Sequence, residues 1–202
     1  MKIELGQHAL LLGETGAGKT YWARDYLRKC RRVLVVDTKD GLDFPPKEWP
    51  VVSLDGLKRS GVLTQEDRAF HWAFRPTPTN EEADVEALCY LLLKKARNMI
   101  VYFDEITDYS DANRCGPWLK QMFRKSRGRG ISNMASSQRP AGLNHWFSEN
   151  CQYKVLFYFG RYDGENTAIG RIMNEHREAV PYGSHKYLVV APGDQVTVRE
   201  KI

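Results

Sequence analysis

Short apolar runs that end in polar or glycine-containing segments recur along the chain and predict buried β-strands. The clearest runs lack polar alternation, a pattern typical of strands that are covered on both faces, as in a parallel sheet. They are His8 to Leu12, Arg32 to Val36, Asn98 to Phe103, Ile131 to Ser137 and Gln152 to Phe159. Shorter strands are predicted at Lys2 to Leu5, Val51 to Leu54 and Arg68 to Phe74.

Helical segments alternate with these strands. Tyr21 to Lys29 is compatible with a helix, and Glu81 to about Lys95 has apolar residues at helical spacing. Further helices are predicted from Pro117 and over Glu165 to Glu175, followed by a β-hairpin within Lys186 to Arg199. We therefore predict an α/β fold in one domain, 1–202, with a mostly parallel central sheet flanked by helices and a C-terminal β-hairpin. The proline-punctuated residues 42–79 are predicted to be an irregular elaboration of it.

Composition narrows the class of protein. With 202 residues the chain can bury a core without disulfides or metals, and its four cysteines include no C-x2-C pair. We expect reduced, buried thiols, as in a cytoplasmic protein. The amino terminus lacks the apolar core of a signal peptide, and we expect no integral membrane segment. The formal charge of +5 suits a polyanionic partner.

A glycine-rich segment follows the first buried strand and begins a helix. It has the form G-x4-G-K-[ST] of a phosphate-binding P-loop, in which backbone N–H groups surround the phosphates of a nucleoside triphosphate. In this loop a lysine contacts the β- and γ-phosphates, and the hydroxyl after it completes the coordination of Mg²⁺. The predicted binding residues are Gly13, Glu14, Thr15, Gly16, Ala17, Gly18, Lys19 and Thr20.

Two carboxylates follow the apolar run that ends at Phe103. Asp104 is predicted to bind a water of the Mg²⁺ shell, and Glu105 to polarise the water that attacks the γ-phosphate. A strand that ends in Asp-Glu is common, but its position downstream of a P-loop predicts a Walker B element with a catalytic glutamate.

Three other polar clusters have both a functional and a structural interpretation. The arginines at 124, 127 and 129 can bind phosphate, either on DNA or on the nucleotide of a neighbouring subunit, or can form a solvated helix end. Gln138, at a strand tip, can sense the γ-phosphate or simply be a polar loop residue. The segment Asp37 to Gly41 can lie near the site or form an ordinary turn.

Three segments together resemble the FtsK/HerA superfamily of DNA-pumping ATPases: GETGAGKT, NMIVYFDE and SRGRGISNMASSQRP. The resemblance implies a RecA-like P-loop NTPase fold. It also implies that Arg127 is an arginine finger acting on the next subunit, with Arg124 and Arg129 as alternates, and that Gln138 is the sensor. Chromosome translocases of this superfamily contain membrane segments, an additional motor subdomain and a winged helix, which 202 residues do not accommodate. The chain is more similar to the compact genome-packaging ATPases of internal-membrane icosahedral viruses and phages with double jelly-roll capsids.

The expected function is an ATP-driven, Mg²⁺-dependent DNA translocase that forms a hexameric or pentameric ring and pumps double-stranded DNA into a capsid. Expected partners are DNA, other copies of the chain and a capsid or membrane protein at the packaging vertex, in the host cytoplasm or on the virion. Candidate DNA-gripping loops are Leu54 to Gln65 and Arg139 to Ser148, which includes His145 and Trp146.

Three alternatives follow from the same residues. One is a phage assembly ATPase of the zonula occludens toxin type, acting on single-stranded DNA, and another is a small-molecule P-loop kinase. The third is a nucleotide-gated switch that docks on a capsid or membrane protein with little turnover. GTP specificity is disfavoured, because the chain has no N-K-x-D motif.

Overall fold

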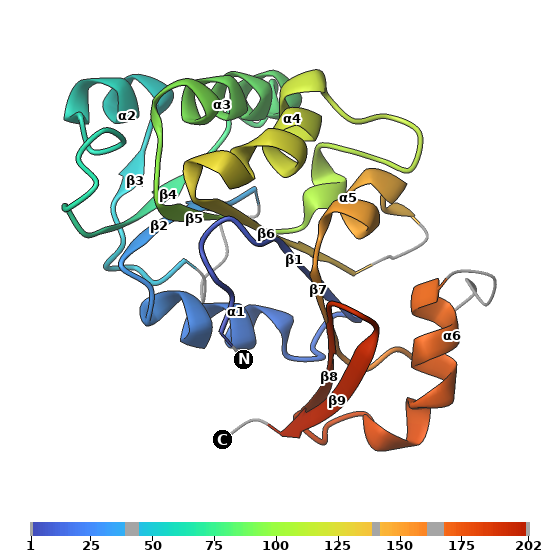
Figure 1. The fold of residues 1–202 in the computed structure, drawn as a ribbon. Helices are drawn as coiled ribbons and strands as arrows, with labels where there is room; N and C mark the ends of the chain where they lie inside the picture. Colours follow the sequence, from blue (N-terminus) through green and yellow to red (C-terminus); the bar gives the residue numbers. More distant parts are fainter. Residues whose placement is uncertain (1, 39–44, 139–141, 161–167, 201–202) are drawn as a thin grey trace.

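The computed structural model describes residues 2–38, 45–138, 142–160 and 168–200, and within them it contains a sheet of nine strands (Figure 1). The strand order is β3-β4-β2-β5-β6-β1-β7-β8-β9. All pairings from β3 to β7 are parallel, and β8 and β9 extend the sheet in antiparallel fashion. The predicted α/β class, mostly parallel sheet and C-terminal hairpin are confirmed. The strands are β1 (Ala9–Leu12), β2 (Arg32–Val36), β3 (Val51–Val52), β4 (Phe70–Phe74), β5 (Met99–Phe103), β6 (Ile131–Ser137), β7 (Tyr153–Leu156), β8 (Lys186–Ala191) and β9 (Gln195–Glu200).

Helices cover both faces of the sheet. In Figure 1, α2, α3, α4 and α5 lie above the sheet, α1 lies below it, and α6 lies beside the C-terminal hairpin. The helices are α1 (Lys19–Arg28), α2 (Leu54–Ser60), α3 (Glu81–Lys95), α4 (Pro117–Lys125), α5 (His145–Asn150) and α6 (Ala168–Glu175). Short 3₁₀ turns are η1 (Ile106–Asp108), η2 (Ser126–Arg129) and η4 (Arg177–Ala179).

The alternation of side chains along β1 divides the core into two layers. Leu10 and Leu12 belong to the larger apolar cluster, which contains the buried faces of α3 and α4. Ala9 and Leu11 belong to a second cluster with Trp22 of α1. Successive residues of a strand point to opposite faces, so a continuous apolar run is required where both faces are covered.

The parallel strands place three predicted segments at one edge. The P-loop follows β1, Asp104 follows β5, and Gln138 follows β6, which lies between them. Because parallel strands end at the same edge, the P-loop is a neighbour of Asp104 and Gln138, which lie more than 80 residues further along the chain.

Two predictions at the element level were wrong. Lys2 to Leu5 forms no strand; instead the backbone N–H of Ile3 donates to the Tyr26 hydroxyl, 3.0 Å away. The strands predicted at Val51 to Leu54 and Arg68 to Phe74 are present as β3 and β4, which extend the parallel sheet. The predicted loop at Leu54 to Gln65 begins with helix α2, whose Leu57 is buried.

The second candidate loop is only partly described. Residues 139–141 lie outside the described ranges, and α5 follows from His145. Phe147 of α5 is buried against Phe123 of α4, with ring centroids 4.9 Å apart. This part of the candidate loop is therefore packed onto the core.

Candidate active site

The P-loop folds around the amino terminus of α1. Gly16 and Gly18 have φ angles of +78° and +101°, which favour glycine. The Lys19 side chain is 7% exposed, and its ammonium donates to the carbonyl oxygens of Gly13 (2.6 Å) and Glu14 (2.9 Å). The lysine charge therefore lies within the loop, where a phosphate would replace the carbonyls as its partner.

Asp104 is held at the end of β5 by hydroxyl groups. Its Oδ1 accepts from the Ser136 hydroxyl (3.0 Å) and the Tyr102 hydroxyl (3.3 Å). Burial and the Asp104 charge raise the pKa of Tyr102 well above its usual range, so Tyr102 stays protonated and donates. Asp104 lines the same cavity as Thr20. Carboxylate and hydroxyl oxygens are the hard ligands that Mg²⁺ prefers, so this pair fits the ion.

Glu105 has an unusual backbone for its residue type. It lies in the left-handed region at φ 48° and is 6% exposed. Its N–H donates to the Ser136 hydroxyl at 2.9 Å, and its Oε1 accepts from the Thr107 hydroxyl (2.7 Å) and the backbone N–H of Gln138 (3.0 Å). A non-glycine residue in this region costs free energy, which the surrounding hydrogen bonds must offset.

Gln138 connects the P-loop to Glu105. Its side-chain oxygen accepts from the Thr15 hydroxyl, and its backbone N–H donates to the Glu105 carboxylate. A change at the P-loop can therefore reach the glutamate through one residue. The surrounding cavity of about 270 Å³ is lined by Thr15, Gly16, Gly18, Lys19, Thr20, Tyr21, Asp104, Glu105 and Gln138.

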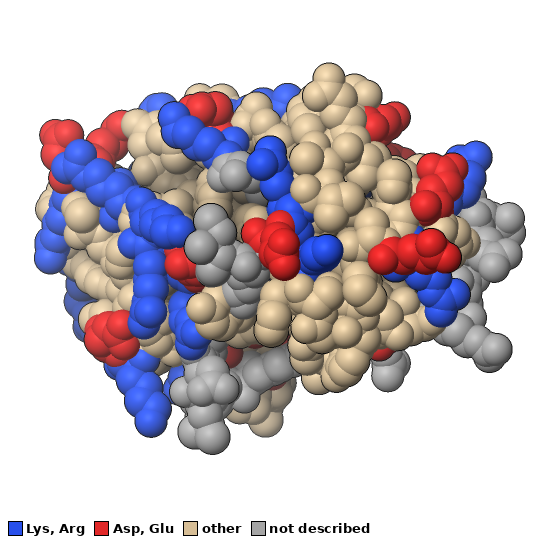
Figure 2. Space-filling view, turned by 90° about the horizontal axis from the view of Figure 1, so that it is seen from below, with Lys and Arg blue, Asp and Glu red and all other residues tan. Residues whose placement is uncertain are grey.

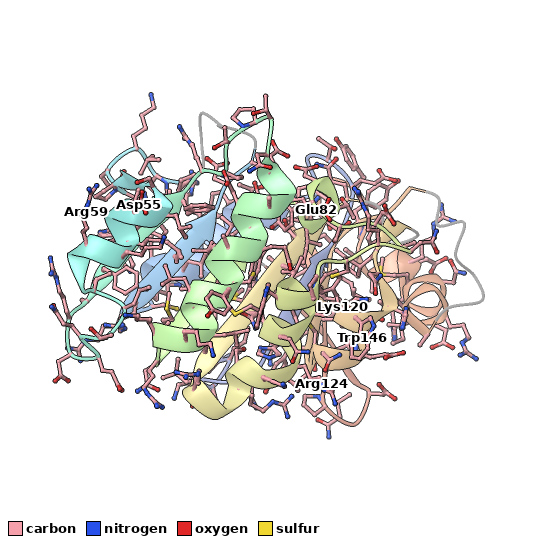
Figure 3. All side chains as sticks on the ribbon, turned by 90° about the horizontal axis from the view of Figure 1, so that it is seen from above. Asp55, Arg59, Glu82, Lys120, Arg124 and Trp146 are labelled. Carbon is pink, nitrogen blue, oxygen red and sulfur yellow. The ribbon has the colours of Figure 1, made fainter. Side chains whose placement is uncertain are left out.

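The predicted arginines lie at the other end of β6. Arg127 is exposed in η2, before the strand begins, whereas Gln138 follows the strand. Seven strand residues at about 3.3 Å each separate the two ends by about 20 Å. Arg124 is also exposed, at the end of α4 (Figure 3), and Arg129 donates to the Ala96 carbonyl at 3.4 Å. The structure therefore does not bring Arg127 to the P-loop of its own chain.

The contacts of Asp37 and Thr38 after β2 favour an ordinary structural role for the start of the segment Asp37 to Gly41. The Asp37 carboxylate is 1% exposed and pairs with the Arg75 guanidinium at 2.9 Å, beside the end of β4. Thr38 donates to the carboxylate of Asp108 at 2.6 Å. Residues 39–41 lie outside the described ranges.

Sequence reasoning missed Ser136 and Gly160, which help to position the site. Ser136 contacts both Asp104 and the backbone of Glu105, and the N–H of Gly160 donates to the carboxylate of the predicted P-loop residue Glu14 at 2.6 Å. Ser136 had one detectable signal, because β6 is fully buried and yet contains several polar residues. Buried polar groups need partners, so such a strand indicates hydrogen bonds to its neighbours.

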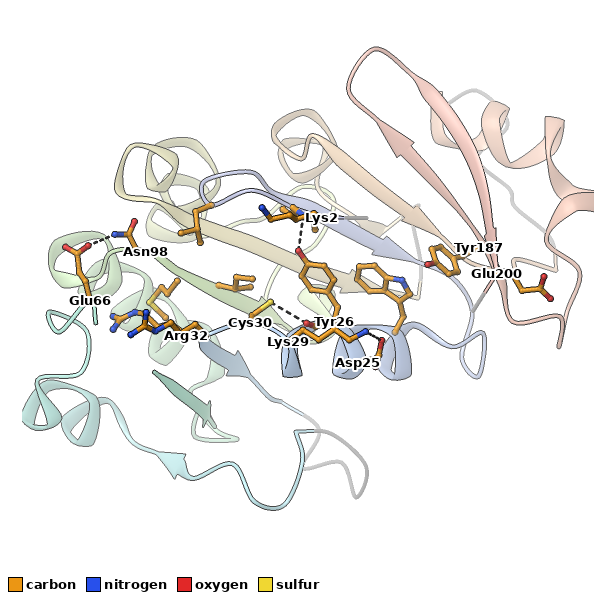
Figure 4. A pocket seen from close by; sticks show the side chains of 16 residues that line it. Lys2, Asp25, Tyr26, Lys29, Cys30, Arg32, Glu66, Asn98, Tyr187 and Glu200 are labelled. Carbon is orange, nitrogen blue, oxygen red and sulfur yellow. Dashed lines mark hydrogen bonds and ion pairs between the residues drawn. The ribbon is translucent and has the colours of Figure 1, made fainter. Parts of the chain in front are cut away.

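A hollow of about 1060 Å³ lies on the α1 face, between Tyr26, Cys30 and Tyr187, away from the P-loop (Figure 4). Burial raises the pKa of the Cys30 thiol to about 11, so this cysteine is not a ready nucleophile. Among the described residues there is no cluster of three His, Cys, Asp or Glu side chains that suits a metal, and no helix suited to crossing a bilayer.

Surface charge is uneven on the α1 face. Lys and Arg side chains gather toward the side of the sheet that ends in β3 and β4, with Asp and Glu among them (Figure 2). Some of these charges are paired, as in the contacts Arg28 to Glu48 and Lys29 to Asp25. The face therefore has a mixed, partly basic surface.

Comparison with solved structures places the fold. No family model matches the chain, and neither does any curated protein sequence. The genome packaging NTPase B204 from Sulfolobus turreted icosahedral virus 2, in complex with ATP-gammaS, is similar over 99% of this chain and 100% of its own, with a TM-score of 0.77 and 15% identity.

Two further structures are similar at lower scores. The pCW3 conjugation coupling protein TcpA has a TM-score of 0.65 and 19% identity over 99% of this chain and 62% of its own. The N-terminal domain of zonular occludens toxin from Neisseria meningitidis has a TM-score of 0.52 and 15% identity over 97% and 93%. At these identities the likeness establishes a shared fold, in agreement with the P-loop NTPase fold that the motifs predicted.

Proposed function

We propose that this protein is an ATPase that hydrolyses ATP in an oligomeric ring to translocate double-stranded DNA during packaging of a viral genome. The observation behind the proposal is the convergence of Lys19, Thr20, Asp104, Glu105 and Gln138 on one cavity, while Arg127 lies at the opposite edge of the sheet. The B204 protein of Sulfolobus turreted icosahedral virus 2, described as a genome packaging NTPase, has the same fold over its whole length.

Four residues of the cavity would have distinct roles in ATP hydrolysis. The Lys19 ammonium exchanges the carbonyls of Gly13 and Glu14 for the β- and γ-phosphates. Thr20 and Asp104 would hold Mg²⁺, which neutralises charge on the phosphate oxygens when bound. Glu105 orients and polarises the attacking water.

Gln138 couples this chemistry to movement. Its amide contacts the P-loop and its backbone contacts Glu105, so loss of the γ-phosphate would change both bonds. We expect this change to reach a DNA-contacting surface of the protein. Because phosphate contacts would dominate DNA binding, we expect little sequence preference and a steep dependence on salt.

Arg127 makes hydrolysis depend on assembly. An exposed arginine about 20 Å from its own P-loop can act on the nucleotide of the next subunit in a head-to-tail ring. There it would neutralise charge that develops on the γ-phosphate, with Arg124 as the alternate. The proposal includes a capsid or membrane protein of the packaging vertex as a partner, in the host cytoplasm or on the virion.

The test is the ATPase rate per subunit against protein concentration, without DNA, with single-stranded DNA and with double-stranded DNA. The proposal expects a rate that rises with concentration, rises further with double-stranded DNA, and is lost in Arg127→Ala. Mixing Arg127→Ala with Lys19→Ala should restore part of the rate, since each variant supplies what the other lacks. An ATPase rate per subunit that is independent of protein concentration, DNA and Arg127 would contradict the ring motor. Greater stimulation by single-stranded than by double-stranded DNA would support the toxin-type alternative.

A further inference from the structure

The cavity at the P-loop has a volume of about 270 Å³, and its lining consists mainly of residues that suit phosphate and metal. We therefore expect the nucleoside to rest on surface beside this cavity. Few large apolar side chains are exposed among the described residues, and two of them, Tyr21 and Tyr182, flank the loop.

Strand order indicates the side on which the nucleoside lies. Asp104 and Gln138 follow β5 and β6, which lie on one side of β1, so the γ-phosphate end of the nucleotide belongs there. The other end then extends toward the opposite side of β1, where β7 is followed by β8. Tyr158 follows β7 and Tyr182 precedes β8.

A tight turn presents Tyr182 to the P-loop. The N–H of Ser184 donates to the Pro181 carbonyl at 3.1 Å, and Gly183 supplies the positive φ of +74° that such a turn requires. A methyl carbon built on Gly16 would lie 3.9 Å from the Tyr182 hydroxyl. The Tyr182 side chain is nonetheless 67% exposed, so its position beside the loop leaves ring surface open.

Tyr158 supports this ring from behind. The two rings meet edge to face, with centroids 5.1 Å apart and an interplanar angle of 66°. The Tyr158 carbonyl accepts from the P-loop N–H of Glu14 at 3.1 Å, so the pair is fixed to the loop. Tyr21 is a weaker candidate, because the Arg24 guanidinium already lies over its ring at 4.8 Å.

We propose that Tyr182 stacks on the base of the bound nucleotide, with Tyr158 as its support. The proposal rests on the nucleotide site described above and adds the subsite for the nucleobase. Stacking uses the face of the ring and no hydrogen-bond pattern, so ATP and GTP should gain affinity from it to a similar extent.

The test compares ligands with and without a base. Calorimetric titration would measure the dissociation constants of ATP, GTP and inorganic tripolyphosphate, each with Mg²⁺, on the full chain. Stacking on one aromatic ring corresponds to roughly five- to a hundred-fold in affinity. Tyr182→Ala should lose affinity for ATP and GTP by a factor in this range and keep its affinity for tripolyphosphate, while Tyr182→Phe should resemble the wild type.

Two control variants complete the design. Tyr90→Ala removes a tyrosine of comparable exposure (45%) on α3 and should change no affinity. Lys19→Ala should lose ATP and tripolyphosphate alike.

Three results would overturn the subsite: equal ATP affinity in Tyr182→Ala and wild type, equal losses for ATP and tripolyphosphate in Tyr182→Ala, or a base-selective loss in Tyr21→Ala instead. If the wild type binds neither ATP nor tripolyphosphate, the nucleotide site itself is contradicted, and with it the proposed ATPase. Failure of the base subsite and failure of the proposed function are therefore distinguishable.

Discussion

The two ends of β6 differ in what surrounds them. At the carboxyl end, Ser136 and Gln138 join a hydrogen-bonded network that includes Asp104, Glu105 and the P-loop, and the bond between Ser136 and Glu105 is buried. At the amino end, Arg127 is exposed to solvent in η2. The site at the carboxyl end of β6 is built from contacts within one chain, whereas at the amino end the Arg127 charge faces solvent.

This difference indicates where each end acts. Buried hydrogen bonds fix side chains in place, as binding and water activation require. An exposed guanidinium pays for desolvation only when a partner arrives, so it suits a contact made between subunits. Variants at the two ends should therefore separate effects of assembly from effects inside one chain.

The largest effect is expected at the amino end. Arg127→Ala should lower kcat by about a thousandfold, the scale of arginine fingers in other NTPases, and leave ATP affinity nearly unchanged. Steady-state hydrolysis above the concentration for assembly would measure it. The neighbouring exposed Arg124→Ala is the matched control. A large loss in Arg124→Ala with normal Arg127→Ala would transfer the role to the alternate.

At the carboxyl end, Glu105→Gln should lower kcat by about a hundredfold or more, because the amide cannot accept a proton from water. ATP binding and assembly should persist, since Gln can still accept hydrogen bonds from Thr107 and Gln138. Phosphate release would measure the loss of turnover, and titration with ATP would measure the retained binding. Partner binding that continues unchanged while turnover is lost would favour the nucleotide-gated switch over the motor.

His8, near the amino end of β6, should make the stability of the folded protein depend on pH. His8 is fully buried, its Nδ1 accepts from the backbone N–H of Asn133 at 3.0 Å, and burial together with the Arg127 charge lowers its pKa from 6.5 to about 4. The unfolded chain therefore binds a proton below pH 6.5 that the folded chain refuses. Stability should fall by about 3 kcal/mol as the pH drops from 6.5 to 4.

Urea unfolding across this pH range would measure the contribution of His8. His8→Asn retains an acceptor for Asn133 without a titrating group and should unfold with a flatter pH dependence. Equal slopes in the two proteins would show that His8 does not contribute.

The smallest effects are expected for substitutions of two serines of β6, Ser136 and Ser132, which should differ in their effect on activity. Ser136→Ala removes the hydroxyl that accepts from the N–H of Glu105 and should cost about 2 kcal/mol of stability. By loosening Asp104 and Glu105, it should also lower kcat about tenfold and raise the Mg²⁺ requirement. Ser132→Ala, at the amino end, removes bonds to Gly6 and Glu4 and should lose stability without that change in Mg²⁺ requirement. Chemical denaturation and Mg²⁺ titration would compare them.

Local patterns were sufficient for the parts of the site that lie within one segment. The glycines before Lys19 and the apolar run before Asp104 predict a P-loop and a strand that ends in carboxylates, because loop chemistry and strand burial depend on neighbouring residues. The same patterns predicted the α/β class and the closing hairpin, which the structure confirms.

Only the tertiary structure decided which distant residues meet. Placing β6 between β1 and β5 brings Gln138 to Thr15 and Ser136 to Glu105, and it sends Arg127 to the far edge. In the same way, the carboxylate of Glu86 on α3 accepts from two backbone N–H groups at the start of α4. Such contacts depend on strand order and helix packing, which arise from burial over the whole chain and leave little trace in any short segment.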